Sequence, residues 1–156
     1  MNDETNEQGK VAGIDFGTVR IGVAISDPRR TMAFPLENYT RKNEAKDAEF
    51  FKQLAASEQL TRFVVGLPLH MSGDLSEKAR EAIAFGRWLG ELTGVPVDYY
   101  DERYSSVEAE RYLIEAQLSR KKRKQKLDKV AAQILLSAYL ESGCRGTTEY
   151  LSLDGD

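Results

Sequence analysis

Residues 11–27 read VAGIDFGTVRIGVAISD, and the arrangement of the remaining chain follows from them. Two short apolar segments, residues 11–16 and 21–26, flank a connection that contains a glycine, which is the pattern of a β-hairpin. Asp15 does not fit a plain hairpin, because an ionised carboxylate on an apolar strand is costly unless it is paired or bound to a metal. We therefore interpret Asp15 either as a turn-capping residue beside Gly17 or as a metal ligand at the head of a central strand.

Hydrophobic periodicity along the rest of the chain predicts three further strands and four helices. Residues 31–39 form the third strand, which we place at an edge of the sheet because Pro35 cannot donate a ladder hydrogen bond. The other two strands are expected over residues 62–69 and 95–100. The helices are expected over residues 44–60, from an Asp74–Glu77 capping pair to about Gly94, from Ser105 to about Leu118, and from Asp128 to about Leu140.

This order of elements predicts an α/β protein with a mixed five-stranded sheet. Three consecutive strands form an antiparallel meander, and two parallel strands join it through helical crossovers, so that helices flank the sheet. We expect a disordered polar tail over residues 1–9, one domain over residues 10–143 and a loose acidic tail over residues 144–156.

Composition narrows the classes of partner and compartment. The net charge of −3 gives no global basic field, although a local basic patch suffices to bind nucleic acid. Cys144 is the only cysteine, which excludes an internal disulfide. The sequence shows neither a secretory leader nor an apolar run near the ~18 residues of a membrane span, so we expect a cytoplasmic protein without a membrane partner.

A second unusual stretch, YYDERYSS over residues 99–106, lies at the carboxyl end of a predicted strand and before a predicted helix. Ligands bind at this end of the strands in α/β sheets, which makes Asp101 and Glu102 candidate ligands. Either acid could instead pair with Arg103 or place negative charge at the N-terminus of the next helix.

The last predicted helix carries a third acid. Asp128 shares a helix face with Ala131, Ala132 and Leu135, and the two small alanines would let the helix approach the sheet near the first strand. Asp128 is alternatively an ordinary N-cap or first-turn acid. The predicted buried stripe of this helix consists of Leu127, Val130, Ala131, Ile134, Leu135 and Ala138.

Asp15, one acid of the Asp101–Glu102 pair and Asp128 can form a single carboxylate cluster. Ionised carboxylates do not crowd together unless a cation neutralises them. Oxygen ligands without a set of Cys and His residues point to Mg²⁺ or Mn²⁺. Such clusters, holding one or two metal ions, serve the hydrolysis of phosphodiester bonds.

A basic run directly precedes Asp128 and could present phosphates to the same cluster. Contacts of this kind are independent of base sequence and weaken with salt, whereas the alternative interpretation is a solvated loop. Arg20 and Arg103 would add to the positioning of a nucleic-acid backbone. The basic residues of the run are Arg120, Lys121, Lys122, Arg123, Lys124 and Lys126.

Four blocks over about residues 11–142 resemble, in order and spacing, the signature blocks of the YqgF/RuvX family: GIDFGTVRIGVAISD, VVGLPLHMSG, DERYSSVEAE and DKVAAQILLSAYL. The resemblance implies an RNase H-like fold related to the resolvase RuvC. It also implies a cytoplasmic bacterial nuclease that processes pre-16S rRNA or resolves Holliday junctions. Carried over by motif, Asp15, Glu102 (in preference to Asp101) and Asp128 would form the acidic active site, and the Gly-Leu-Pro block at residues 66–68 would shape its floor.

One block departs from the family pattern. After Gly-Leu-Pro-Leu the family commonly reads Asn-Met-Asp-Gly, whereas this chain has His70-Met71-Ser72-Gly73. The asparagine and aspartate to which a ligand role would attach are therefore absent here. We interpret His70, the only histidine, as a surface-loop residue, with assistance at a phosphate or leaving group as the alternative.

The resulting hypothesis is a metal-dependent nuclease, a hydrolase that acts on the 5′ end of pre-16S rRNA as a monomer or homodimer. One alternative is a Holliday-junction resolvase, which requires a two-fold dimer. Another is a non-catalytic RNA-binding factor in ribosome assembly. The Asp-Phe-Gly-Thr residues at 15–18 also resemble the first phosphate loop of actin-like ATPases, but those proteins close a cleft between two such domains, and 156 residues leave room for one.

Overall fold

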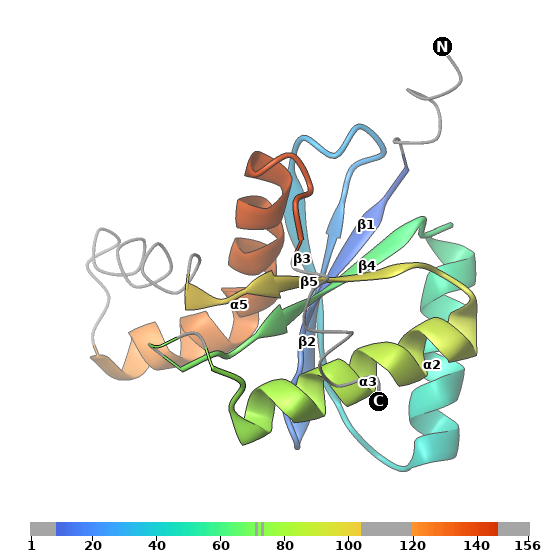
Figure 1. Ribbon diagram of the computed structural model, residues 1–156. Coiled ribbons are helices and arrows are strands. Elements are labelled where there is room, and N and C mark those ends of the chain that lie inside the picture. Colours follow the sequence, from blue (N-terminus) through green and yellow to red (C-terminus); the bar gives the residue numbers. More distant parts are fainter. Residues whose placement is uncertain (1–8, 71, 73, 104–119, 147–156) are drawn as a thin grey trace.

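A computed structural model describes residues 9–70, 72, 74–103 and 120–146, with the helix at 120–129 described by its backbone alone. Its centre is a five-stranded sheet in the order β3-β2-β1-β4-β5, with helices on both faces (Figure 1). The strands are β1 (Val11–Asp15), β2 (Arg20–Ser26), β3 (Ala33–Thr40), β4 (Arg62–Leu67) and β5 (Val97–Asp101). The helices are α2 (Glu44–Ser57), α3 (Glu77–Thr93) and α5 (Arg120–Glu141).

The strand β1 lies in the middle of the sheet and runs antiparallel to β2, as the hairpin pattern predicts. β2 pairs antiparallel with β3, while β4 and β5 extend the sheet in parallel on the other side of β1. The predicted α/β architecture, a three-strand meander with two parallel strands, is confirmed. β3 is an edge strand, as Pro35 predicts, and a register shift between Val23 and Ala24 of β2 marks a β-bulge in this pair.

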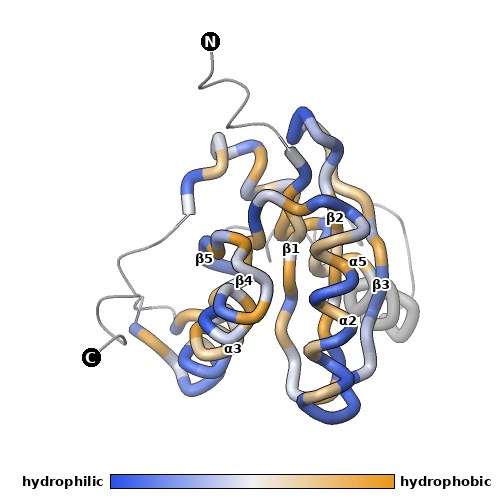
Figure 2. Tube along the Cα trace, turned by 90° about the vertical axis from the view of Figure 1, so that its right-hand side faces the viewer, coloured by the Kyte–Doolittle hydropathy of each residue, from blue (hydrophilic) through white to orange (hydrophobic). Residues whose placement is uncertain are grey.

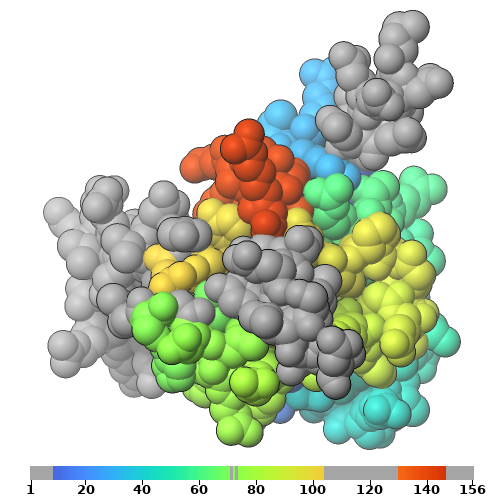
Figure 3. Space-filling model, in the orientation of Figure 1, coloured from blue at the N-terminus to red at the C-terminus, as the bar shows by residue number. Residues whose placement is uncertain are grey.

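Side chains alternate along the strands, and this alternation divides the core into two layers. Ala12 and Ile14 of β1 enter the layer under α2 and α3, whereas Val11 enters the layer under α5. Figure 2 shows α2 and α3 in front of the sheet, and hydrophilic and hydrophobic residues alternate along each helix. Figure 3 shows the two helices side by side on the surface. Odd-numbered residues of β1 therefore share the α5 side of the sheet.

Helix α5 packs closely on β1 and β2, and at Gly13 this contact requires the absence of a side chain. A Cβ atom at Gly13 would lie 2.8 Å from Leu136 Cβ and 3.1 Å from the backbone oxygen of Ala132. A Cβ atom at Gly22 would lie 3.5 Å from Ala132 Cβ, which is an ordinary contact distance. Gly13 is therefore the position that fixes how closely α5 crosses the sheet.

The prediction that the last helix begins at Asp128, after a basic loop, is wrong, because α5 begins at Arg120. Lys, Arg and Gln are strong helix formers, and neither Gly nor Pro occurs between residues 120 and 141. The basic run is therefore the first part of the helix.

The buried stripe of α5 also differs from the predicted one. The contact with the strand glycines turns Ala132, Leu136 and Tyr139 inward, and leaves Ala131 and Ile134 only half-buried. Hydropathy alone favoured the latter two because their spacing also fits an apolar stripe.

The N-terminal cap of α3 is Ser76 and not the predicted Asp74. The Ser76 hydroxyl accepts a hydrogen bond from the Ala79 N–H at 3.0 Å and donates one to the Pro68 carbonyl at 2.6 Å. This hydroxyl therefore joins the start of the helix to the segment that follows β4. The helix stops before Gly94, as predicted, and Gly94 takes a left-handed conformation with φ 76°.

The ends of β4 and β5 differ by one or two residues from the predicted ends, because Pro68 and Pro96 cannot donate ladder hydrogen bonds. The helix predicted from Ser105 to Leu118 lies outside the described residues, as do residues 1–8 and 147–156 of the two predicted tails. Within the described ranges, no helix has the length and apolar character that crossing a membrane requires.

A buried carboxylate ties the edge strand to α2. Asp47 is 5% exposed, and it accepts hydrogen bonds from the Tyr39 hydroxyl at 2.7 Å and the Lys42 backbone N–H at 2.9 Å. Burial alone would raise the pKa of Asp47, but these hydrogen bonds and the charge of Arg41 outweigh burial and lower it. Burial and the hydrogen bond to Asp47 raise the pKa of Tyr39 to about 12, so the phenol remains a donor.

Asp47→Asn is expected to lower the free energy of unfolding near pH 7 by about 1–3 kcal/mol, because the neutral amide weakens the hydrogen bonds to its oxygen and puts an NH2 group in place of the oxygen that pairs with Arg41. The folded-state pKa of Asp47 lies below that of the unfolded chain, so this contribution is lost as the pH falls through the folded-state value. Urea unfolding at neutral and acidic pH measures it, with Glu49→Gln, exposed on the same helix, as the control. A difference between wild type and Asp47→Asn that does not shrink with falling pH would contradict this role.

Candidate functional site

Two acidic side chains meet at the carboxyl ends of β1 and β5. Asp15 ends β1, and Glu102 follows β5 directly, with its backbone N–H donating to the Leu67 carbonyl of β4 at 3.0 Å. Alternation along β5 places Tyr100 under α5, and therefore places Glu102 on the α5 side and Asp101 on the other. Asp15 also lies on the α5 side, and its carboxyl group is hydrogen-bonded to that of Glu102.

Gly66 of β4 provides the room in which Glu102 reaches Asp15. A Cβ atom at Gly66 would lie 2.9 Å from Cγ and 3.0 Å from Cδ of Glu102, which is closer than such atoms approach in folded proteins. The Glu102 side chain therefore lies directly over the backbone of the strand between β1 and β5. This gives a physical reason for the glycine in the Gly-Leu-Pro block.

The carboxyl group of Glu102 is protonated more readily than a free one. Burial, the charge of Asp15, the hydrogen bond to Asp15 and the charge of Asp101 raise the pKa of Glu102 to about 8. Near neutral pH the Asp15–Glu102 pair consequently holds one proton and carries one negative charge.

Asp101 is bound by a neighbouring arginine. Its two carboxylate oxygens accept hydrogen bonds from Arg103 Nε at 3.0 and 2.9 Å, and one also accepts the Arg103 backbone N–H at 2.9 Å. Arg103 Nη1 lies 3.4 Å from the carbonyl oxygen of His70, whose side chain is exposed. The alternative considered for Asp101, pairing with Arg103, is the arrangement that the structure shows.

A hollow of about 210 Å³ opens beside Asp15. Arg20, a predicted phosphate ligand, lines it and is exposed. Asn38 also lines it, although the sequence patterns did not single this residue out. Asn38 reaches the hollow because it is the register partner of Gly22, so only the β2–β3 register could have found it. The lining residues are Asp15, Phe16, Gly17, Arg20, Gly22 and Asn38.

Asp128, the third predicted acid, lies on α5, the helix that crosses this site. Ala132 packs at Gly22, which is the register partner of Asp15, and Asp128 lies one helical turn before Ala132 on the same face. The side chains of residues 120–129, including those of the basic run, lie outside the described part of the structure. Among the side chains that are described, no three His, Cys, Asp or Glu residues form a group that could hold a metal ion.

Glu102→Gln is expected to remove a pH dependence of stability in the presence of EDTA. Because the folded chain holds the Glu102 proton to a pKa of about 8, above the value of 4.5 for an ordinary glutamate, the wild-type free energy of unfolding falls as the pH rises between these values. Glutamine has no proton to lose, so the free energy of unfolding of the variant should not fall in this way. The variant should be as stable as wild type at acidic pH and more stable at alkaline pH, by on the order of a few kcal/mol.

Thermal denaturation across this pH range measures the effect, and Glu91→Gln, exposed on α3, serves as the control. Parallel pH profiles of wild type and Glu102→Gln would show that the glutamate does not share a proton with Asp15.

Comparison with known proteins identifies relatives over nearly the whole folded chain. A family model described as "RuvX: Holliday junction resolvase" matches residues 9–142. A protein of Rhodopirellula baltica is 47% identical over 137 residues, which cover 88% of this chain and 79% of that protein. A protein of Syntrophomonas wolfei is 44% identical over 137 residues, covering 88% and 97%. Both carry the name "Putative pre-16S rRNA nuclease".

Solved structures share the fold at low sequence identity. Thermus thermophilus RuvC in complex with a Holliday junction substrate superposes with a TM-score of 0.54 at 15% identity, covering 88% of this chain and 98% of RuvC. A second structure of the same RuvC gives a TM-score of 0.53 at 14% identity. These superpositions confirm the expected RNase H-like fold. Because the family model and the two similar sequences match nearly the whole folded chain, the chain belongs to the RuvX family of Holliday junction resolvases.

Proposed function

We propose that this protein is a nuclease that requires a divalent metal ion and hydrolyses phosphodiester bonds at the 5′ end of precursor 16S rRNA. The observation that carries the proposal is the pairing of Asp15 with Glu102 on the α5 side of the sheet. Membership of a nuclease family supports the reaction, and the names of relatives in two organisms support the RNA substrate.

The Asp15–Glu102 pair fits a divalent metal ion. The raised pKa of Glu102 reflects its burial and, after that, the negative charge of Asp15 beside it, and a bound cation would relieve the repulsion between the two carboxylates. Carboxylate oxygens are the donors that Mg²⁺ and Mn²⁺ prefer. Asp15, Glu102 and Asp128 would hold the ion, whereas Asp101, which was also a candidate from the sequence, is bound by Arg103 on the other side of the sheet. When bound, the ion would activate a water molecule and stabilise the leaving oxygen of the phosphodiester.

Basic side chains would position the nucleic acid beside this pair. Arg20 is exposed in the hollow beside Asp15, so it can bind a phosphate close to the scissile one. The basic run from Arg120 to Lys126 stands on the helix that carries Asp128, and its phosphate contacts would weaken with salt. Arg103 would contribute positive potential while its guanidinium orients Asp101.

Cleavage of a four-way DNA junction is a second candidate, which the description of the matching family model favours. Junction resolution requires a two-fold dimer that cuts paired strands symmetrically, whereas trimming of a precursor RNA does not. The two candidates therefore differ in oligomeric state as well as in substrate.

Asp15→Asn is expected to lower the cleavage of a pre-16S rRNA 5′-end substrate by about a hundredfold or more, the usual effect of removing one charge-stabilising group from an active site. The melting temperature should not fall, since asparagine keeps the shape and no longer repels Glu102. Cleavage of this RNA and of a four-way DNA junction is measured with Mg²⁺, Mn²⁺ or EDTA, with Glu49→Gln as a control for loss of charge.

EDTA-sensitive cutting of the RNA alone, lost in Asp15→Asn, is the expected result. Symmetric cutting of the junction by a dimer would replace rRNA processing with resolution as the function. Binding of RNA without cutting of either substrate would assign a non-catalytic role in ribosome assembly. Full activity of Asp15→Asn would exclude the metal site proposed here.

Gly66→Ala is expected to reduce kcat by about tenfold to a hundredfold, because the new methyl group displaces Glu102 from Asp15. The overpacking should also cost about 1–3 kcal/mol of stability. Gly90→Ala on α3 is the matched control, since its Cβ would meet no atom nearer than Val97 Cγ2 at 3.3 Å. If Gly66→Ala keeps wild-type kcat, the space over β4 does not position Glu102.

A further inference from the structure

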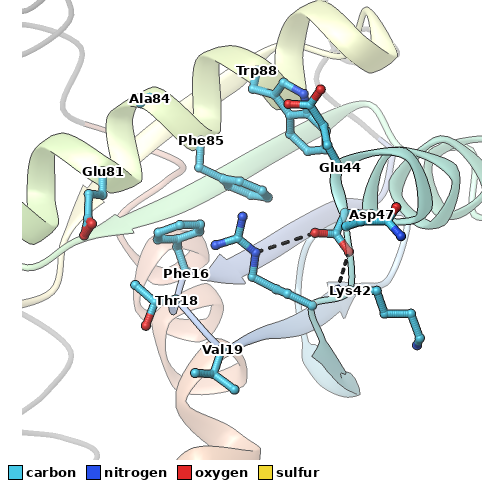
Figure 4. A pocket seen from close by; sticks show the side chains of 12 residues that line it. Phe16, Thr18, Val19, Lys42, Glu44, Asp47, Glu81, Ala84, Phe85 and Trp88 are labelled. Atoms are coloured by element: carbon cyan, nitrogen blue, oxygen red, sulfur yellow. Dashed lines mark hydrogen bonds and ion pairs between the residues drawn. The ribbon is translucent and has the colours of Figure 1, made fainter.

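A hollow of about 730 Å³ lies on the side of the sheet opposite to the Asp15–Glu102 pair (Figure 4). It is bounded by the connection between β1 and β2, the connection between β3 and α2, the first turn of α2 and one side of α3. Its volume is in the range of about 300–1,000 Å³ that is typical of small-ligand sites. The proposed nuclease chemistry leaves it without a role.

Three aromatic rings form one wall of the hollow. The ring centroids of Phe16 and Phe85 are 4.8 Å apart, and those of Phe85 and Trp88 are 5.4 Å apart. Phe16 and Trp88 are only half-buried, so part of each ring faces the hollow, as Figure 4 shows. Such a wall offers stacking contacts to a flat aromatic ligand.

A guanidinium group is held against this wall. Arg41 Cζ lies 5.2 Å from the centroid of the Phe16 ring, and Arg41 Nε lies 3.6 Å from a carboxylate oxygen of Asp47. The Arg41 backbone N–H donates to the Val19 carbonyl at 2.9 Å. These contacts fix the planar group at the hollow, where it adds a second surface on which a base can stack.

The polar groups around the hollow match the edges of a nucleobase better than a phosphate. Glu44 and Glu81 offer acceptors, Lys42 offers donors and Thr18 offers both. Two cationic side chains line the hollow beside three carboxylates, those of Glu44, Asp47 and Glu81, so positive charge is not concentrated there as it is in phosphate sites.

The hollow adjoins the proposed active site at the end of β1. Phe16 lines both this hollow and the smaller one beside Asp15. Asp15 and Phe16 are consecutive residues, so their Cα atoms are about 3.8 Å apart while their side chains enter opposite sides of the sheet. A nucleic-acid strand with a phosphate at Asp15 therefore reaches the second hollow by crossing the connection between β1 and β2.

We propose that this hollow binds one unpaired nucleobase of the substrate, next to the phosphodiester held at Asp15. The base stacks against Trp88 and on the Arg41 guanidinium that covers Phe16, and its edge meets the carboxylates. The inference rests on the proposed nuclease function and specifies its substrate: the strand must be single-stranded beside the cut, because a base inside a duplex cannot enter a side pocket without leaving the stack.

The fluorescence of Trp88 tests the proposal, since Trp88 is the only tryptophan in the chain. A short oligoribonucleotide added in EDTA, where no cleavage is required, is expected to quench this fluorescence to saturation. A series of oligonucleotides is then compared, each of which lacks the base at a different position. One member of the series should bind about tenfold more weakly than the intact oligonucleotide, which is the effect expected from losing one stacked base.

Ala84→Leu is the variant that fills the hollow. Ala84 lines the hollow and is exposed on α3, so a leucine there occupies the hollow without disturbing the core. We expect it to weaken the binding of the oligoribonucleotide by about tenfold and to raise KM for cleavage. Ala56→Leu, exposed on α2 and away from the hollow, is the matched control and should bind as wild type does.

Equal quenching in Ala84→Leu and wild type, or no quenching by any oligoribonucleotide, would overturn the proposal. If a free mononucleotide quenches the fluorescence at the same concentration as the oligonucleotide does, the proposal is also overturned, and the hollow is a small-molecule site. Cleavage assays on the same preparations separate this inference from the nuclease function. Cleavage without quenching refutes the base site alone, and position-dependent quenching without cleavage supports the base site and refutes the nuclease.

Discussion

The contact of α5 with two strand glycines is the constraint on which the candidate site depends. Gly13 and Gly22 leave no side chain between the β1–β2 hairpin and the backbone of α5 around Ala132. At Gly13 the helix lies nearer the sheet than any larger residue would permit, and this contact fixes its course over the strand that ends in Asp15. A methyl group at Gly13 would lift the helix and move the turn that contains Asp128 away from the central strand.

The Asp15–Glu102 pair is unfavourable for the fold in a way that other buried acids are not. Asp47 accepts hydrogen bonds from Tyr39 and the backbone, and its lowered pKa shows that its charge is stabilised. Glu102 has a raised pKa, because burial and a neighbouring carboxylate oppose its charge. Perturbed acids of this second kind gather at functional sites, which is the reason for treating the Asp15–Glu102 pair as the candidate site.

Local sequence patterns were sufficient to predict the sheet, and they singled out Asp15 and the Asp101–Glu102 pair, of which the structure brings Asp15 and Glu102 together. The alternation of apolar residues and the position of Pro35 predicted the strands and the edge, and the same alternation separates Glu102 from Asp101. The start of α5 was missed because basic residues give no hydropathy signal, even though their helix propensity is high. Asn38 and the clash at Gly66 depend on register and on contacts across strands, which no local pattern contains.

The edge strand β3 has a consequence for association between molecules. Edge strands expose unpaired backbone groups to which a strand of another molecule can add, and Phe34 and Leu36 of β3 are 44% and 43% exposed. Pro35 stands between them without an N–H to offer, and the bulge at Leu36, which the register leaves unpaired between Pro35 and Glu37, disturbs the flatness that strand addition requires. Pro35 and the bulge, which belong to neither the core nor the carboxylate pair, therefore make this edge a poor template for adding a strand of a second molecule.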